Sequence, residues 1–394
     1  MVGIERRYQA FLDARGREGL RRYLTAVAAL DARTIRVEGR SYVNLASNDY
    51  LGLRFHQALS ARATEWAKAY GVGSGASRLV TGNLDAFAPI EAKIAKLKGK
   101  PAALIMASGF QTNGAVLQAL LDQSVLGAEP LVFCDRLNHA SMHFGCQAAG
   151  VRQLRYRHCD LGHLGELLSQ YQGDSRPRFI LTESVFSMDG DVAPLKEIAA
   201  LARAHGAMLI VDDAHATGIL GEEGRGLSDE ADIAIGTFSK ALGGFGGYVA
   251  CSETVRDYLI NRCGGLIYST ALPPPVLGAI DAALDLVPGM DAERARVASL
   301  AVRFRAGARA LQLDTDASTT QIVPVILGSP EAAMAMSGRL RQAVLWAASI
   351  RPPSVPAGTA RLRLAFTAAH EESDIDRLLN VLDQQDLAPR AGAM

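Results

Sequence analysis

Apolar runs alternate with amphipathic stretches over most of the chain, from about residue 50 to residue 285. Short runs with the length and composition of buried strands lie at 102–106, 130–134, 178–182, 208–212, 233–237 and 247–251. Stretches with the period of helices lie between them, at 112–121, 161–171 and 194–205. This alternation predicts an α/β fold with a mostly parallel sheet that carries helices on both faces.

The two ends of the chain depart from this alternation. Residues 5–30 have the composition of one or two helices, and residues 35–45 alternate like a strand pair with a turn at 38–40. Prolines at 273–275 end the regular pattern. Beyond them, a smaller α+β unit is indicated by helices at 292–311, 330–345 and 372–383 and by strands at 321–327 and 361–367. We expect an N-terminal arm (1–45), a large domain (46–285) and a small C-terminal domain (286–394) that ends in a loose tail at 388–394.

Composition narrows the class of protein. Hydrophobic residues make up 49% of the 394 residues and charged residues 21%, as in ordinary globular proteins. Acids and bases balance at 41 each, which favours a small-molecule substrate over nucleic acid or a membrane surface. The chain shows neither a membrane span nor a secretory signal, and its five scattered cysteines fit neither a disulfide framework nor a zinc site. We therefore expect a cytoplasmic protein.

Lysine is scarce in this chain, and one lysine has unusual surroundings. Only seven of the 41 basic residues are lysines, and six of them lie in charged, helix-like stretches. Lys240 lies instead between the apolar run 233–236 and two glycines. A lysine amine can form an imine with a carbonyl, whereas the guanidinium of arginine stays protonated. Lys240 is therefore the candidate to hold pyridoxal 5′-phosphate (PLP), although a general bias toward arginine would also make lysine scarce.

Polar residues follow two predicted strands at the ends where ligands bind to open parallel sheets. Ser108 and Gly109 follow the strand at 102–106, and the free N–H groups of the helix that starts there could bind a phosphate. Asp212 or Asp213 ends the strand at 208–212 and could keep a pyridine nitrogen protonated. His215, just beyond, could then bond the hydroxyl of the same ring.

Two further strand ends complete the candidate site. Thr237 and Ser239 lie beside Lys240 and could touch the phosphate, and His139 could stack on the ring or bind a substrate carboxylate. Each feature alone has an ordinary explanation, such as a helix cap, a core histidine or a surface lysine. Asp212 and a lysine 28 residues later (240 − 212), each at the end of its own strand, form a much narrower pattern.

Other chemistry-bearing patterns are excluded by their context. Residues 71–76 (GVGSGA) fit the dinucleotide-binding pattern, but the preceding stretch 61–68 is helix-like rather than a strand, which excludes NAD. His139 and His143 have the spacing of two zinc ligands but lack the glutamate of the metalloprotease pattern, so no metal is expected. The nucleophile elbow of serine hydrolases and the Walker A pattern do not occur in the sequence.

Almost the whole chain resembles the α-oxoamine synthases, which are fold-type I PLP enzymes that condense an amino acid with an acyl thioester. The matching segments are 47–52 (SNDYLG), 73–78 (GSGASR), 138–141 (NHAS), 183–191 (ESVFSMDGD), 212–218 (DDAHATG), 237–240 (TFSK) and 351–364 (RPPSVPAGTARLRL). The last segment, with its Arg-Pro-Pro opening, is most similar to the biotin-pathway branch, which uses L-alanine and a pimeloyl thioester. Ser354, Ala76 and Ala216 are conservative departures from the usual pattern of that branch.

This resemblance implies roles for individual residues. Lys240 would carry the imine, Asp212 rather than Asp213 would pair with the pyridine nitrogen, His215 would bond the ring hydroxyl, and His139 would stack on the ring. Further cofactor contacts would come from Ser108, Gly109, Phe110, Ser187, Thr237 and Thr270. Substrate contacts would come from Arg21, Asn48, His139, Ser354 and Arg363, the last as a planar clamp on the amino-acid carboxylate.

The resemblance also implies a homodimer with active sites at the interface, where Thr270 would reach the partner's phosphate. The expected reaction is a decarboxylative condensation, and the sequence leaves open whether coenzyme A or a carrier protein bears the acyl group. One alternative is a branch of the family that uses glycine, such as glycine C-acetyltransferase or 5-aminolevulinate synthase. Another is a protein of this fold that binds PLP without turnover. The amino acid that perturbs the cofactor spectrum, and release of CO₂, would discriminate among them.

Overall fold

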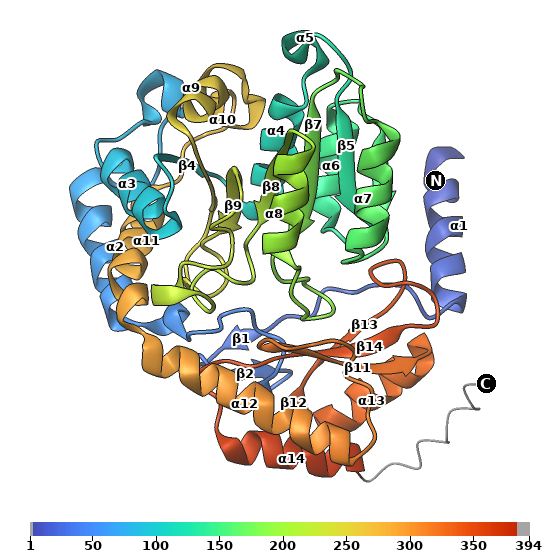
Figure 1. Cartoon of the computed structure of the whole chain (residues 1–394). Helices are drawn as coiled ribbons and strands as arrows, with labels where there is room; N and C mark the ends of the chain where they lie inside the picture. Colours follow the sequence, from blue (N-terminus) through green and yellow to red (C-terminus); the bar gives the residue numbers. More distant parts are fainter. Residues whose placement is uncertain (1–2, 384–394) are drawn as a thin grey trace. The chain divides into compact units, whose positions relative to one another are not determined.

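The computed structural model describes residues 3–383, which form two compact units (Figure 1). The larger unit comprises Asn48–Ser187 and Asp191–Ala295, and the smaller unit comprises Met1–Ser47, Met188–Gly190 and Arg296–Met394. The domain boundaries expected after residues 45 and 285 stay a prediction. The tail expected at 388–394 lies outside the described residues.

A seven-stranded sheet forms the centre of the larger unit. Its strands are β4 (Ala102–Met106), β5 (Leu131–Asp135), β6 (Gln153–Tyr156), β7 (Arg178–Glu183), β8 (Ala207–Asp212), β9 (Ile233–Thr237) and β10 (Gly247–Cys251). They lie in the order β4-β10-β9-β8-β7-β5-β6, with β10 antiparallel to both of its neighbours and the other pairs parallel. The mostly parallel sheet predicted from the sequence is confirmed, and β6 is the strand that the prediction missed.

Helices cover both faces of this sheet (Figure 1). The helices of this unit are α2 (Gln57–Tyr70), α3 (Phe87–Lys98), α4 (Gly109–Leu120), α5 (Gln123–Leu126), α6 (Ala140–Ala148), α7 (Leu161–Gln170), α8 (Leu195–Ala204), α9 (Glu253–Arg262), α10 (Gly264–Ile267) and α11 (Pro274–Leu286). Successive side chains of β5 alternate between two apolar cores because neighbouring strand residues point to opposite faces. Val132 packs in the core with α4 and α6, whereas Phe133 packs in the core with α7 and α8.

In the part of the smaller unit that the structure describes, there are two small sheets and four α-helices. Its strands are β1 (Ala28–Ala29), β2 (Thr34–Val37), β3 (Arg40–Asn44), β11 (Ile322–Gly328), β12 (Leu345–Trp346), β13 (Ala348–Ile350) and β14 (Ala360–Ala365). One sheet has the order β1-β2-β3-β12 and the other the order β11-β14-β13. The helices are α1 (Gly3–Arg17), α12 (Asp291–Ala310), α13 (Pro330–Gln342) and α14 (Glu372–Asp383), of which α12 has its first residues in the larger unit. The helices and strands predicted for the C-terminal region are confirmed within a few residues.

The N-terminal region contains the predicted turn and one of the one or two helices expected there. The turn between β2 and β3 has positive φ angles at Glu38 and Gly39, as a two-residue hairpin turn requires. The second helix considered for residues 5–30 is absent, since 18–27 contain no helix. The first helix stops there because Gly19 has a φ of 65° and the Leu20 N–H donates to the Arg15 carbonyl at 2.8 Å, which completes a Schellman ending. The described residues contain no helix long and apolar enough to cross a bilayer.

A buried histidine makes the stability of the smaller unit sensitive to acid. His370 accepts a hydrogen bond from the Thr367 N–H at 3.1 Å, and its other ring nitrogen donates to the Asn44 carbonyl at 3.1 Å. Burial lowers the pKa of His370 from 6.5 to about 4. An unfolded chain therefore takes up a proton on this residue at a pH where the folded chain does not. The contribution of neutral His370 to the free energy of unfolding is fully present above pH 6.5 and is lost as the pH falls toward 4.

We predict that the variant His370→Gln loses less stability on acidification than the wild type does. At pH 4.5 the wild type should have lost about 2 kcal/mol through His370 relative to neutral pH, and the variant should lack this component. The free energy of unfolding, measured by denaturant titration at several pH values, tests this. Identical pH dependence in the two proteins would contradict the assignment.

Candidate active site

One cavity in the larger unit brings together groups that are far apart in the sequence. Its volume is about 230 Å³, and it lies where the carboxyl ends of β7, β8 and β9 approach the start of α4. Ligands bind at this edge of α/β sheets because strand ends and helix starts direct polar groups there. The predicted cofactor residues that line it are Ser108, Gly109, Phe110, His139, Asp212, His215, Thr237 and Lys240.

Lys240 lies in the connection between β9 and β10, and Thr237 holds that connection in place. The Thr237 hydroxyl donates to the Gly246 carbonyl at 2.7 Å and accepts the Ser239 N–H at 3.2 Å. The Thr237 and Ser239 hydroxyl oxygens are 2.8 Å apart. Lys240 itself is half-buried in the cavity wall. A single threonine therefore fixes both the start and the end of the segment that carries the amine.

The start of α4 faces the same cavity. Ser108 is the N-cap of this helix, and its hydroxyl accepts the Gln111 N–H at 3.3 Å. The first N–H groups of a helix lack partners within the helix and attract anions. A side chain at Gly109 would lie 3.3 Å from the Thr237 side chain, so glycine keeps this entrance open. The geometry suits a bound phosphate.

The sequence pattern did not decide whether Asp212 or Asp213 faces the cavity, and the structure shows that Asp212 does. Asp212 lines the cavity, where its carboxylate accepts the Asn113 side-chain N–H at 2.6 Å and the Ala214 N–H at 3.0 Å. Asp213 is fully buried elsewhere in the larger unit and forms an ion pair with Lys98. The Ser228 hydroxyl also donates to Asp213, at 3.1 Å. Asp212 can therefore contact a ligand in the cavity, whereas Asp213 neutralises the buried Lys98 ammonium.

His215 is held by a tyrosine that the sequence analysis did not single out. The hydroxyl of Tyr50 lies 2.7 Å from Nδ1 of His215 and 3.1 Å from Oδ1 of Asn48. Tyr50 is fully buried, so its hydroxyl has a fixed position. Residues 47–52 match a segment of the family that the chain resembles, but no periodicity in the sequence pairs Tyr50 with His215.

A polar chain connects His139 to Asp212. Nδ1 of His139 lies 2.7 Å from the Ser141 hydroxyl oxygen, and that oxygen accepts the Asn113 side-chain N–H at 2.9 Å. Asn113 donates to Asp212 as well. Burial lowers the pKa of His139, and the nearby Lys240 ammonium lowers it further. Neither Asn113 nor Ser141 was among the predicted site residues, although both follow predicted strands.

Glu183 is a second acid in the cavity wall and was also missed. It ends β7 directly beside Asp212, with which it is in register across the β7–β8 pair. Burial raises the pKa of Glu183 well above its usual range, and the neighbouring Asp212 charge adds to the rise. Its Oε1 atom is buried and has no hydrogen-bond partner among the described residues. A polar residue at the end of a predicted strand was the signal that could have found it.

The other predicted residues lie outside the lining of this cavity. Asn48 holds Tyr50, Ser187 is nearly buried beyond β7, and Thr270 forms an isolated antiparallel bridge with Ser77. These residues belong to the larger unit. Because they do not line the cavity, their predicted roles stay predictions.

Three predicted substrate residues belong to the smaller unit. Arg363 is nearly buried on β14, and Ser354 accepts a hydrogen bond from the Arg22 guanidinium at 3.0 Å. The guanidinium of Arg21 lies instead 5.3 Å from the centre of the Tyr23 ring. A cavity of about 120 Å³ is lined by Arg22, Arg351 and Ser354 among others. The structure thus places Arg22 rather than Arg21 beside Ser354.

A charged cluster supports the loop that carries His139. His158 bonds Asp135 at 3.0 Å and Asp191 at 2.8 Å, and these contacts raise the pKa of His158 to about 12 despite its burial. Asp135, His158 and Cys159 offer ligand atoms of the types that bind metals. Both ring nitrogens of His158 are already engaged with carboxylates, so the cluster acts as an ion pair that links the last residue of β5 and the segment after β6 to the segment after β7.

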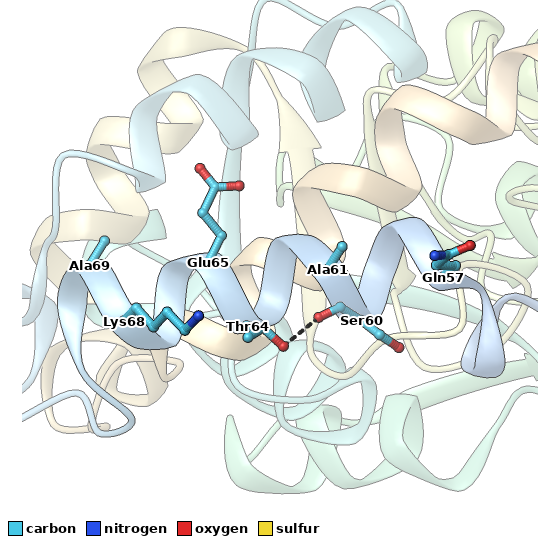
Figure 2. A pocket seen from close by; sticks show the side chains of 7 residues that line it. All are labelled: Gln57, Ser60, Ala61, Thr64, Glu65, Lys68 and Ala69. Carbon is cyan, nitrogen blue, oxygen red and sulfur yellow. Dashed lines mark hydrogen bonds between the residues drawn. The ribbon is translucent and has the colours of Figure 1, made fainter.

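A hollow of about 690 Å³ in the larger unit lies elsewhere, along one face of α2 (Figure 2). Small and charged side chains of that single helix line it, including Ser60, Glu65 and Lys68. No other element contributes a lining group. Convergent groups from several elements, which chemistry requires, occur in the cavity that contains Lys240.

Comparison with known proteins agrees with this geometry. Residues 40–382 match the family described as aminotransferase class I and II. The chain belongs to this family. A curated member, the 8-amino-7-oxononanoate synthase of Gluconacetobacter diazotrophicus, is 55% identical over 95% of this chain and 96% of its own length.

Solved structures of the family are similar over most of their length. A high-resolution structure of an enzyme named SPT, with a PLP internal aldimine, has a TM-score of 0.86 at 27% identity and covers 97% of this chain and 96% of its own. The 8-amino-7-oxononanoate synthase of Francisella tularensis has a TM-score of 0.75 at 27% identity and covers 87% and 97%. The chain therefore has the fold-type I architecture that the sequence resemblance implied.

We predict that Asp213→Asn destabilises the protein by about 3–5 kcal/mol, because it leaves the buried Lys98 ammonium without its partner. Asp212→Asn, the matched control at the cavity wall, should cost clearly less because it breaks no ion pair with a buried lysine. Urea titration of both variants measures the difference. Equal losses of stability would show that the two acids are not separated as described.

Proposed function

We propose that this chain is an 8-amino-7-oxononanoate synthase of biotin biosynthesis. In this reaction L-alanine condenses with a pimeloyl thioester, and CO₂ and the free thiol are released. The observation that carries the proposal is the 55% identity to an enzyme of that name over 95% of the chain. The cavity that joins Lys240, Asp212 and His215 supplies matching chemistry.

PLP is the proposed cofactor because the groups in the cavity fit its three recognition points. The Lys240 amine suits the aldehyde, the Asp212 carboxylate suits the pyridine nitrogen, and the start of α4 with Ser108 suits the phosphate. The unpartnered Oε1 of Glu183 marks a polar position in the wall that a ligand can complete. When bound, PLP supplies a ring that stabilises negative charge on the substrate carbon that loses its proton.

The residues of the chain then perform the remaining steps. Lys240 would hold the cofactor through its aldehyde, and its free amine would remove the proton from Cα of alanine. The Asp212 carboxylate would accept the N–H of the pyridinium and so favour the charged ring. His215 would bond the ring hydroxyl, and His139 would stack on the ring. The deprotonated carbon would attack the thioester carbonyl, and the thiolate would leave as the C–S bond breaks. The alanine carboxylate would then depart as CO₂, and the same carbon would take up a proton to give the product.

Substrate recognition is proposed to involve Arg363, Asn48 and the Ser354 region. A guanidinium binds a carboxylate through two parallel hydrogen bonds, which suits Arg363 for the alanine carboxylate. In the smaller unit, the cavity beside Ser354 carries Arg22 and Arg351, whose charges suit the anionic end of the acyl donor. Arg21, proposed from resemblance, keeps its place beside Tyr23.

We further propose a homodimer, with Thr270 at the interface, that works in the cytoplasm. Phe110 and Phe144 are each about half exposed and lie with ring centres 5.4 Å apart, although large apolar side chains on a protein surface are usually covered. Tyr268, near Thr270, is 86% exposed. A second copy of the chain would cover these side chains. All five cysteines are free thiols, as in proteins of reducing compartments.

We predict that purified protein incubated with L-alanine and pimeloyl thioester forms 8-amino-7-oxononanoate together with one CO₂ per turnover. Mass spectrometry of the product and release of labelled CO₂ measure this. Glycine and serine, tested in parallel, should support less than about a tenth of the rate because the proposed branch selects alanine. Preferred turnover of glycine or serine would move the enzyme to another branch of the family.

We predict that Lys240→Ala and Lys240→Arg both abolish turnover, since the site needs an amine that can lose its proton rather than a positive charge. Borohydride reduction followed by peptide mass analysis should add the cofactor mass to the peptide that contains residue 240 in the wild type alone. Lys100→Arg, a partly buried lysine on another surface, is the matched control and should keep activity. Residual activity of Lys240→Arg near the wild-type rate would overturn the assignment.

A further inference from the structure

We infer that Ser141 and Asn113 are positioning residues that hold His139 as the neutral tautomer with its proton on Nε2. In this state His139 can donate a hydrogen bond from Nε2 to a substrate oxygen but cannot accept a proton at Nε2, which already carries one. The inference rests on the proposed function only for the identity of that oxygen. The tautomer itself follows from hydrogen-bond geometry.

Nδ1 of His139 lies within hydrogen-bond distance of two groups of Ser141, its backbone N–H and its hydroxyl. The backbone N–H of Ser141 lies 3.3 Å from Nδ1, and a backbone N–H can only donate. Nδ1 must therefore offer its lone pair, so a neutral ring carries its proton on Nε2. The Ser141 hydroxyl, 2.7 Å away, can strengthen this state by donating to the same lone pair.

Asn113 decides the direction of the Ser141 hydroxyl. Its amide nitrogen has two protons, one directed to Asp212 at 2.6 Å and the other to the Ser141 oxygen at 2.9 Å. The Asp212 carboxylate accepts hydrogen bonds, which sets the orientation of the amide. Because the Ser141 oxygen already accepts from Asn113, its own proton is available for His139. Asn113 and Ser141 are 2% and 0% exposed, so water does not compete for these positions.

His143 gives a natural contrast one helical turn away on α6. Its Nδ1 lies 2.6 Å from the Gln153 side-chain oxygen, which can only accept. The Gln153 amide nitrogen faces the His143 carbonyl at 3.5 Å, which fixes that amide orientation. Nδ1 of His143 therefore carries a proton. Two histidines on neighbouring turns should thus show opposite protonation at Nδ1.

The tautomer limits what His139 can do in the reaction. A ring with its proton on Nε2 presents a donor, which suits a carboxylate or the carbonyl oxygen of the thioester as negative charge develops there. Burial and the nearby Lys240 ammonium both lower the pKa of His139 and so favour the neutral ring. The proton abstraction of the reaction is then left to the Lys240 amine.

Nitrogen NMR of protein labelled at its histidine rings tests the inference directly. In cofactor-free wild type near neutral pH, we expect Nδ1 of His139 to have the chemical shift of an unprotonated nitrogen and Nδ1 of His143 that of a protonated one. The variants His139→Gln and His143→Gln assign the signals. This measurement needs no activity, so it stands or fails separately from the proposed function. A protonated Nδ1 on His139 in the wild type would overturn the inference.

Ser141→Ala keeps the backbone donor but removes the hydroxyl, and Ser141→Thr restores a hydroxyl. In Ser141→Ala we expect the His139 nitrogen shifts to move toward a mixture of tautomers. We also expect kcat to fall about tenfold, or about 1.4 kcal/mol, while KM for alanine changes less than about twofold. Ser141→Thr should restore both readouts. A fall in kcat without movement of the nitrogen shifts, or movement without loss of kcat, would refute the positioning role.

Discussion

The pairing of β7 with β8 sets the constraint around which the site is built. It places the carboxyl groups of Glu183 and Asp212 side by side at one sheet edge, where both are nearly buried. Two adjacent buried carboxylates repel each other and lack water, so both cannot be charged at low cost. The surroundings divide their roles. Asp212 receives side-chain and backbone N–H donors, whereas burial and the Asp212 charge favour the protonated form of Glu183.

The side chains at this sheet edge are held in place by buried polar residues behind them. Asn113 stabilises the charge of Asp212 and, through Ser141, connects it to His139. Tyr50 holds His215 from the other side. The ion pair of His158 with Asp135 and Asp191 connects the end of β5, just before the loop that carries His139, to the segment after β7. Side chains that face the cavity thus depend on a second layer of buried polar groups, and this layer keeps them in one orientation.

Much of the fold and of the cavity could be predicted from the sequence because the relevant signals are local. The six predicted strands are continuous apolar runs, as strands buried on both faces must be, and each is present. Ser108, Asp212 and Lys240 were found since each follows such a run. Strand β6 was missed because Gln153–Tyr156 lies at the sheet edge and is only partly buried, so it needs no apolar run. Composition did not decide between one helix and two in residues 5–30, because it carries no information on the φ angle of Gly19.

The supporting residues could not be predicted because their meaning lies in pairs that are distant in sequence. Asn113 and Asp212 are separated by 99 residues, and Tyr50 and His215 by 165. No period or spacing connects them, and only the folded sheet and helices bring them into contact. Asp212 and Asp213 were equivalent as a strand end, and only the opposite directions of neighbouring side chains separate the cavity from the Lys98 ion pair.

The short connection between β9 and β10 has a consequence for the catalytic cycle. These strands are adjacent and antiparallel, and the connection is closed on itself by hydrogen bonds from Phe238 to Gly246, from Gly244 to Phe238 and from Gly243 to Lys240. The main chain beneath the lysine is therefore anchored at both ends. In the proposed mechanism, the change of Lys240 between a cofactor-linked and a free amine requires only rotation about side-chain bonds, which takes picoseconds to nanoseconds for a mobile side chain. Exchange of the amine would then need no opening of this loop.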